Sequence, residues 1–107
     1  MTKEILYKRV TSVCPMERAT FEEDLSCAVK ELCAMFGEKY VLDEQSDLTV
    51  QTEYFTALCS ALLYFHTGDE SDRRRFIERA RTAFLTVWKE RAAKRRKGEG
   101  TYARNGV

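Results

Sequence analysis

The stretch YFHTGDESDRRRF, residues 64–76, decides how the chain folds. Gly68 is the residue type that most often occupies the left-handed position at the end of a helix. Asp69 or Ser71 can then serve as the N-cap of a following helix, and the acidic residues around them favour the positive end of its dipole. The stretch therefore predicts a tight turn that joins two helices.

The same turn raises the question of a metal or catalytic site, because His66 lies close in sequence to Asp69 and Asp72. The spacing of its carboxylates does not match a calcium loop, and three arginines lie beside them. The chain has one histidine, and none of its four cysteines forms a Cys-x-x-Cys pair. We therefore expect no metal, no cofactor and no catalytic residues, and we expect the protein not to be an enzyme.

Apolar helices flank the turn on both sides. The helix before it, 50–66, is apolar on more than one side, so we expect it to be nearly enclosed by other helices or by a neighbouring subunit. The helix after it begins near Ser71 and runs to about Lys97. Its expected apolar stripe consists of Phe76, Ile77, Ala80, Ala83, Phe84, Val87 and Trp88. The stripe fades after Trp88, so we expect the last turns to project from the core or to dock on a partner.

The clearest helix of the first half spans residues 20–36. Thr20 and Glu23 have the spacing of a capping box, in which each side chain bonds the backbone of the other residue. Apolar residues then recur at steps of three and four, which places them on one face. Gly37 is a natural C-cap, so the pattern defines both ends of the helix.

The rest of the first half is less clearly patterned. A weaker helix is expected from 3 to 13, with Thr2 as its N-cap. Residues 40–42 favour a short extended piece, and the acidic segment 43–49 is typical of a loop. The cysteines lie among apolar neighbours and are interpreted as small core residues in a reducing compartment. They are Cys14, Cys27, Cys33 and Cys59.

These elements predict an all-α fold, a single-domain bundle of about four helices with a long basic C-terminal helix. A length of 107 residues suits one domain, which we place at 1–97. The last segment, 98–107, has three glycines and no periodicity, so we expect a flexible tail. No segment has the apolar length of a signal peptide or a membrane-spanning helix.

Charge is strongly polarised along the sequence although the whole chain carries only +1. Residues 1–70 have a net charge of −7, whereas residues 71–97 have a net charge of +8. An acidic surface and a basic surface on one small chain can meet head to tail between copies, and such a contact closes into a ring when its rotation permits. The polarity therefore favours self-assembly, although the charges could also simply be solvated.

The basic end of the last helix is the candidate contact region for a partner or for DNA. A basic helix can neutralise phosphates without reading bases. The sequence has no recognisable helix-turn-helix or zinc finger, so a solvated helix end remains the competing interpretation. The candidate residues are Arg91, Lys94, Arg95, Arg96 and Lys97.

The order of these elements resembles the small α-helical head–tail connector (adaptor) proteins of tailed bacteriophages and prophages. The resemblance covers roughly residues 3–97. It lies in CPMERATFEEDLSCAVKELCAMFGEKYV at 14–41, in YFTALCSALLYFHTGDES at 54–71, and in the long helix that carries AFLTVWKE at 83–90. These motifs are packing patterns, and none is a catalytic signature.

The resemblance implies a structural virion assembly protein, one subunit of a ring that docks beneath the portal and extends the DNA channel. Its implied partners are copies of itself, the portal protein and a tail-completion protein, with no membrane partner. A non-specific contact with the DNA backbone is also implied as an option. The implied location is the head–tail junction of the virion, and the host cytoplasm during assembly. The alternative is a small nucleic-acid-binding regulatory protein that uses the basic C-terminal helix.

Overall fold

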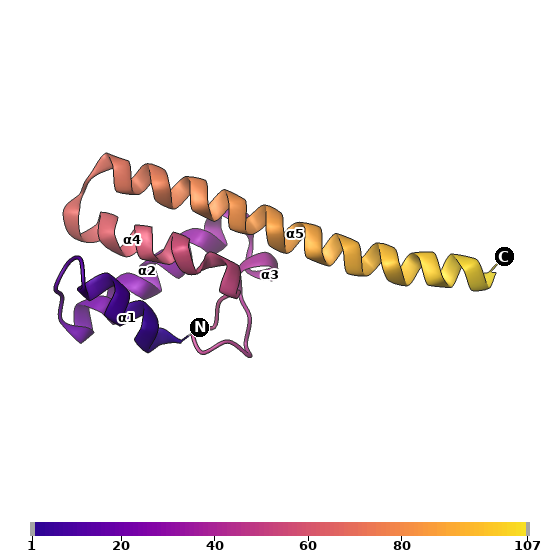
Figure 1. Cartoon of the computed structure of the whole chain (residues 1–107), viewed down its shortest axis with the longest axis horizontal. Coiled ribbons are helices and arrows are strands. Elements are labelled where there is room, and N and C mark those ends of the chain that lie inside the picture. The colour runs from indigo at the N-terminus through magenta and orange to yellow at the C-terminus, as the bar shows by residue number, and fades with distance from the viewer. Residues whose placement is uncertain (1, 107) are drawn as a thin grey trace.

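The computed structural model describes the backbone of residues 2–106 and the side chains of residues 2–95. The chain folds as an all-α bundle, as the sequence predicts, and Figure 1 shows α4 between α5 and α1, with α2 crossing behind it. The elements are α1 (Lys3–Thr11), α2 (Arg18–Phe36), α3 (Glu38–Val41), the 3-10 turn η1 (Thr52–Tyr54), α4 (Phe55–Thr67) and α5 (Glu70–Gly106).

Helix α4 is the centre of the bundle. Residues 57–62 are all buried, so one and a half turns of this helix have no exposed side. The chain's own helices supply this cover, which confirms the predicted enclosure without a neighbouring subunit. The only polar residue in the run is Ser60, and its hydroxyl accepts a hydrogen bond of 2.8 Å from Nη1 of Arg79 on α5. That bond satisfies a buried polar group that would otherwise destabilise the core.

The predicted N-cap of α1 is confirmed, whereas the predicted start of α2 is wrong. Thr2 caps α1, because its Oγ1 accepts a hydrogen bond of 3.2 Å from Ile5 N. The predicted capping box of α2 is wrong: the helix begins two residues before Thr20, after Glu17, whose side chain makes no capping bond. The earlier start places Arg18 where its guanidinium pairs with Glu22 and with a glutamate of α1.

The connection from α2 to α4 is partly helical. Gly37 has φ +88°, and the following residues form the single helical turn α3. The extended piece predicted at 40–42 is therefore wrong for Tyr40 and Val41, and only Leu42 has an extended backbone. The turn buries Val41 and brings the Tyr40 ring edge-on to Phe84, which an extended chain would not do. The predicted acidic loop at 43–49 is confirmed as a loop.

The long loop is fixed at both ends. Leu42 and Val50 form an isolated antiparallel bridge, and Asp43 N donates to Thr49 O at 2.9 Å. Leu48 is buried inside the loop and ties it to the core. The loop is therefore an ordered segment packed on the bundle.

Helix α5 packs on α4 and then continues past the other helices (Figure 1). Its buried positions are Phe76, Ala80, Ala83 and Val87, as the apolar stripe predicts. The segment 98–107, expected to be a flexible tail, continues the helix to Gly106 in its backbone. Its side chains lie outside the described residues, so its flexibility stays a prediction.

The cysteines are distributed between core and surface. Cys59 is buried in α4, Cys14 and Cys33 are half-buried, and Cys27 is exposed on α2. The expectation that all four are core residues is therefore wrong for Cys27, whose position on α2 faces away from α4. Across residues 2–106, none of the helices combines the length and the apolar character needed to cross a bilayer.

Candidate functional site

The turn between α4 and α5 is built by capping interactions. Gly68 adopts the left-handed conformation, φ +70° and ψ 11°, and ends α4. Asp69 Oδ1 accepts hydrogen bonds from Ser71 N at 2.9 Å and Ser71 Oγ at 3.0 Å, and these bonds lower the pKa of the Asp69 carboxyl. The predicted turn is therefore confirmed, with Asp69 as the capping residue.

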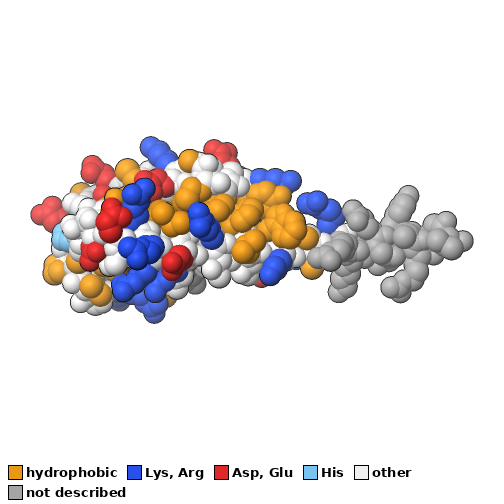
Figure 2. Space-filling view, turned by 90° about the horizontal axis from the view of Figure 1, so that it is seen from above, with side chains coloured by type: hydrophobic (Ala, Val, Ile, Leu, Met, Phe, Trp, Pro, Cys, Tyr) orange, Lys and Arg blue, Asp and Glu red, His pale blue; other side chains and the backbone are white. Residues whose placement is uncertain are grey.

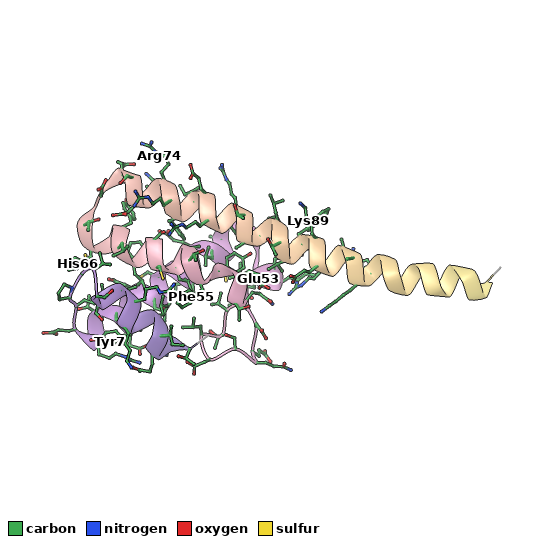
Figure 3. The ribbon with its side chains drawn as sticks, viewed as in Figure 1. Tyr7, Glu53, Phe55, His66, Arg74 and Lys89 are labelled. Atoms are coloured by element: carbon green, nitrogen blue, oxygen red, sulfur yellow. The ribbon has the colours of Figure 1, made fainter. Side chains whose placement is uncertain are left out.

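Asp72 also makes local contacts at the turn. Asp72 accepts a hydrogen bond from Thr67 Oγ1 at 3.0 Å and pairs with Arg75 at 3.6 Å. His66 is exposed at the end of α4 (Figure 3). Among the side chains of residues 2–95, no three histidine, cysteine or acidic groups lie close enough to hold a metal ion.

Arg91, the first of the candidate contact residues, is used inside the fold. Its Nη1 donates a hydrogen bond to the carbonyl of Lys39, and its guanidinium carbon lies 5.2 Å from the centre of the Tyr40 ring. Arg91 lies two turns after Phe84 on the same side of α5, and Phe84 also contacts Tyr40. Arg91 therefore links α5 to α3.

The other candidate residues lie beyond the bundle. Lys94 is seven residues after the buried Val87 and so on the same side of α5, yet it is exposed, because no other helix extends that far. Arg95 is exposed as well. The side chains of Arg96 and Lys97 lie outside the described residues. Of the five predicted contact residues, Arg91 therefore makes contacts within its own chain, whereas Lys94 and Arg95 are exposed.

A feature that the sequence pattern did not predict is an exposed apolar face on α5. Leu85 is 50% exposed and Trp88 is 47% exposed, and they lie about one turn apart. Trp88 was expected in the core, and that prediction is wrong: it lies about 100° around the helix from the buried Val87, too far to reach α4. Figure 2 shows hydrophobic side chains gathered on this side of α5, close to where the helix leaves the bundle.

Exposed basic side chains surround this apolar face. Arg74 and Lys89 point away from the bundle in Figure 3, and Arg81 and Arg95 are also exposed on α5. The sequence identified the basic character of the helix. It did not show that apolar and basic side chains share one outer surface. The signal was Leu85, an apolar residue half a turn away from the buried stripe.

The two flanks of α5 differ in chemistry. On one flank a groove of about 390 Å³ separates α5 from α2, and both apolar and charged side chains line it. It is lined by Glu31, Ala34, Met35, Tyr64, Arg73, Phe76 and Ile77. On the other flank the helix presents Thr82 and Thr86, beside Glu53 of η1. Among the described side chains of α5, the large exposed apolar ones are Leu85 and Trp88.

No family model, curated protein or solved structure matches this chain.

Proposed function

We propose that the protein is a non-catalytic structural subunit of a head–tail connector, a homo-oligomeric ring that docks beneath a portal and extends its DNA channel. The observation that carries the proposal is the exposed pair Leu85 and Trp88 on α5, a helix that extends beyond the rest of the bundle. Large apolar side chains that cluster on a surface mark a contact with another molecule more often than scattered ones do. The pair therefore supports a protein–protein contact.

The polarity of the chain supports assembly between identical copies. The acidic residues belong largely to α2 and the loops, and the basic residues largely to α5, whereas α1 carries one acidic and three basic side chains. Two different surfaces with opposite charge give a head-to-tail contact, which closes into a ring if the rotation between neighbours permits. Helix α4 is covered by the other helices of the same chain and needs no neighbouring subunit, so α5 is the helix that supports assembly.

The capping roles of the acidic turn agree with a structural protein. Asp69 and Asp72 are engaged in local hydrogen bonds at the start of α5. The portal and the tail-completion protein, as partners, rest on the resemblance of the sequence to connector proteins. So does the location at the head–tail junction.

Sedimentation velocity over a range of concentrations tests the proposal. We expect the wild type to form larger species as its concentration rises, or when the portal protein of the same genome is added. The double variant Leu85→Glu/Trp88→Glu should stay monomeric. A matched control is Val13→Glu, because Val13 is 67% exposed on a different part of the surface and should not affect assembly. A wild type that stays monomeric at every concentration, with portal present, would refute the proposal.

The alternative, a nucleic-acid-binding regulator, is favoured by the exposed Arg74, Arg81 and Arg95 on one side of α5. It predicts an affinity for duplex DNA that falls steeply with salt, because each neutralised phosphate releases a counterion. The substitution Arg95→Ala/Arg96→Ala should then weaken binding and flatten the salt dependence. Unchanged binding in this variant would exclude the alternative.

A further inference from the structure

We propose that the outer face of α5 in one copy of the chain packs against the outer face of α2 in the next copy. This inference rests on the proposed self-assembly and assigns the two surfaces that would carry it. Helix α5 carries an exposed apolar pair, α2 carries a row of small residues, and charged side chains flank both.

The first surface, the α5 face, consists of two neighbouring rows of residues. Seven residues make almost two full turns of a helix, so residues seven apart lie nearly on one line. One row contains Trp88 and the other contains Leu85, and both side chains project from the helix. Four basic residues lie on the same side, together with one acidic residue, Glu78, which is seven residues before Leu85. The α5 face, with a net positive charge, is Arg74, Glu78, Arg81, Leu85, Trp88, Lys89, Ala92 and Arg95.

The second surface, the α2 face, has the opposite character. Thr20, Cys27 and Ala34 are seven residues apart, small and exposed, and so form a shallow row along α2. Asp24 and Glu31, also seven residues apart, flank this row on one side. Glu23 and Lys30 border its other side. The α2 face therefore presents small side chains beside a mainly acidic edge.

The two faces are complementary in shape and in charge. Large side chains stand on α5 where small ones lie on α2, and helices pack by fitting the ridges of one into the grooves of the other. Both rows repeat every seven residues, a spacing of about 10.5 Å along a helix. Basic residues such as Arg81 would lie opposite Asp24 and Glu31. The contact would therefore give the basic residues of one copy acidic partners on the next copy.

Symmetric pairings of these faces are unfavourable. Two α5 faces would bring Arg81 and Lys89 against the same residues of the other copy, and two α2 faces would oppose Asp24 and Glu31 to themselves. Like charges placed across an interface cost affinity. The contact is therefore heterologous, with α5 of one copy on α2 of the next, and repeats around a ring. A single pair of helices is a small interface, so the contact should be weak between two copies and stronger in a closed ring.

Disulfide trapping tests the inference, because α2 already carries the exposed thiol of Cys27. The variant Leu85→Cys is made in a Cys14→Ser/Cys33→Ser background, which leaves Cys59 buried. Disulfides form only when the two α-carbons come within about 4.4–6.8 Å, so a bond reports direct contact. We expect mild oxidation to yield a ladder of dimers, trimers and larger species, which a reductant collapses. Adding Cys27→Ser should abolish the ladder.

Charge reversal provides a second measurement that does not depend on thiols. The variants Arg81→Glu/Lys89→Glu and Asp24→Lys/Glu31→Lys should each remain monomeric in sedimentation velocity, because each opposes like charges. An equimolar mixture of the two should assemble, since every contact in an alternating array again pairs acid with base. Assembly of either variant alone as readily as the wild type would overturn the inference.

The outcomes separate this inference from the proposed function. Assembly of the wild type without a ladder would refute the α5-on-α2 contact and leave the connector proposal standing. Dimers that persist in Cys27→Ser would show α5 on α5, with the same consequence. Salt-dependent DNA binding that is lost in Arg81→Glu/Lys89→Glu, with no ladder, would assign the α5 face to nucleic acid and refute the inference. A wild type that never assembles would refute both.

Discussion

The guanidinium of Arg91 lies over the ring of Tyr40, with its central carbon 5.2 Å from the ring centre. The same side chain donates to the carbonyl of the preceding residue, Lys39. These contacts join α5 to the short helix α3 at the point where α5 leaves the bundle. A residue that the sequence pattern assigns to partner contact is therefore a structural anchor within the chain.

Arg91→Ala should lower the free energy of unfolding by about 1–2 kcal/mol, the sum of a cation–π contact and one hydrogen bond. Arg91→Lys should be intermediate, because a lysine keeps the charge and lacks the planar guanidinium. Urea denaturation monitored by circular dichroism measures both. An Arg91→Ala variant as stable as the wild type would show that the anchor contributes nothing.

Phe84→Ala should cost about 2–3 kcal/mol of stability. The ring of Phe84 stacks on Phe36, with centroids 4.7 Å apart, and meets Tyr40 edge-on at 5.4 Å. The adjacent Leu85 is the matched control, since Leu85→Ala removes an exposed side chain and should change stability by no more than about 0.5 kcal/mol. Thermal unfolding of the two variants compares them directly. Equal losses would contradict the packing described for α5.

The buried phenol of Tyr54 should make the free energy of unfolding depend on pH in the alkaline range. Burial favours the neutral phenol and raises its pKa to about 12 in the folded protein, against about 10 in an unfolded chain. Between pH 10 and 12 the unfolded state therefore loses a proton that the folded state keeps, and the free energy of unfolding falls as pH rises.

Tyr54→Phe isolates this contribution. The substitution removes the hydrogen bond from the phenol to the Tyr40 carbonyl, 3.1 Å, so the variant should be less stable at pH 8. Its stability should nevertheless decline less than that of the wild type from pH 10 to 12. Denaturant titrations at each pH measure the two slopes, and parallel slopes would contradict the assignment.

The thiols should differ in reactivity according to their burial. Cys27 is exposed and should react first with iodoacetamide, whereas Cys59 is buried in α4 and its desolvation raises the pKa of the thiol. Because the thiolate is the reactive form, both effects slow Cys59. Peptide mass spectrometry over time gives the order. Early modification of Cys59 in native protein would contradict the enclosure of α4.

Local chemistry explains which parts of the fold could be predicted from the sequence. Gly68 and Asp69 act on their immediate neighbours, so the turn between α4 and α5 follows from residue type alone. The capping box failed because Arg18 gains an ion pair with Glu4 of α1, which a local pattern does not contain. Tertiary contacts of this kind shift helix ends by one or two residues.

The candidate site was less predictable for a geometric reason. Trp88 fits the apolar pattern of α5, but its burial depends on whether another helix lies opposite it. Where the bundle ends is a property of the whole fold. The basic residues were visible in the sequence, whereas their division into an anchor, Arg91, and an outer surface that includes Arg81 required the structure.

Electron microscopy of the concentrated protein, alone and mixed with the portal protein of the same genome, tests the central claim most directly. The proposed connector function predicts closed rings of uniform size, formed by the wild type and absent from Leu85→Glu/Trp88→Glu. Particles that remain single small subunits in both preparations, with no ring on the portal, would contradict it.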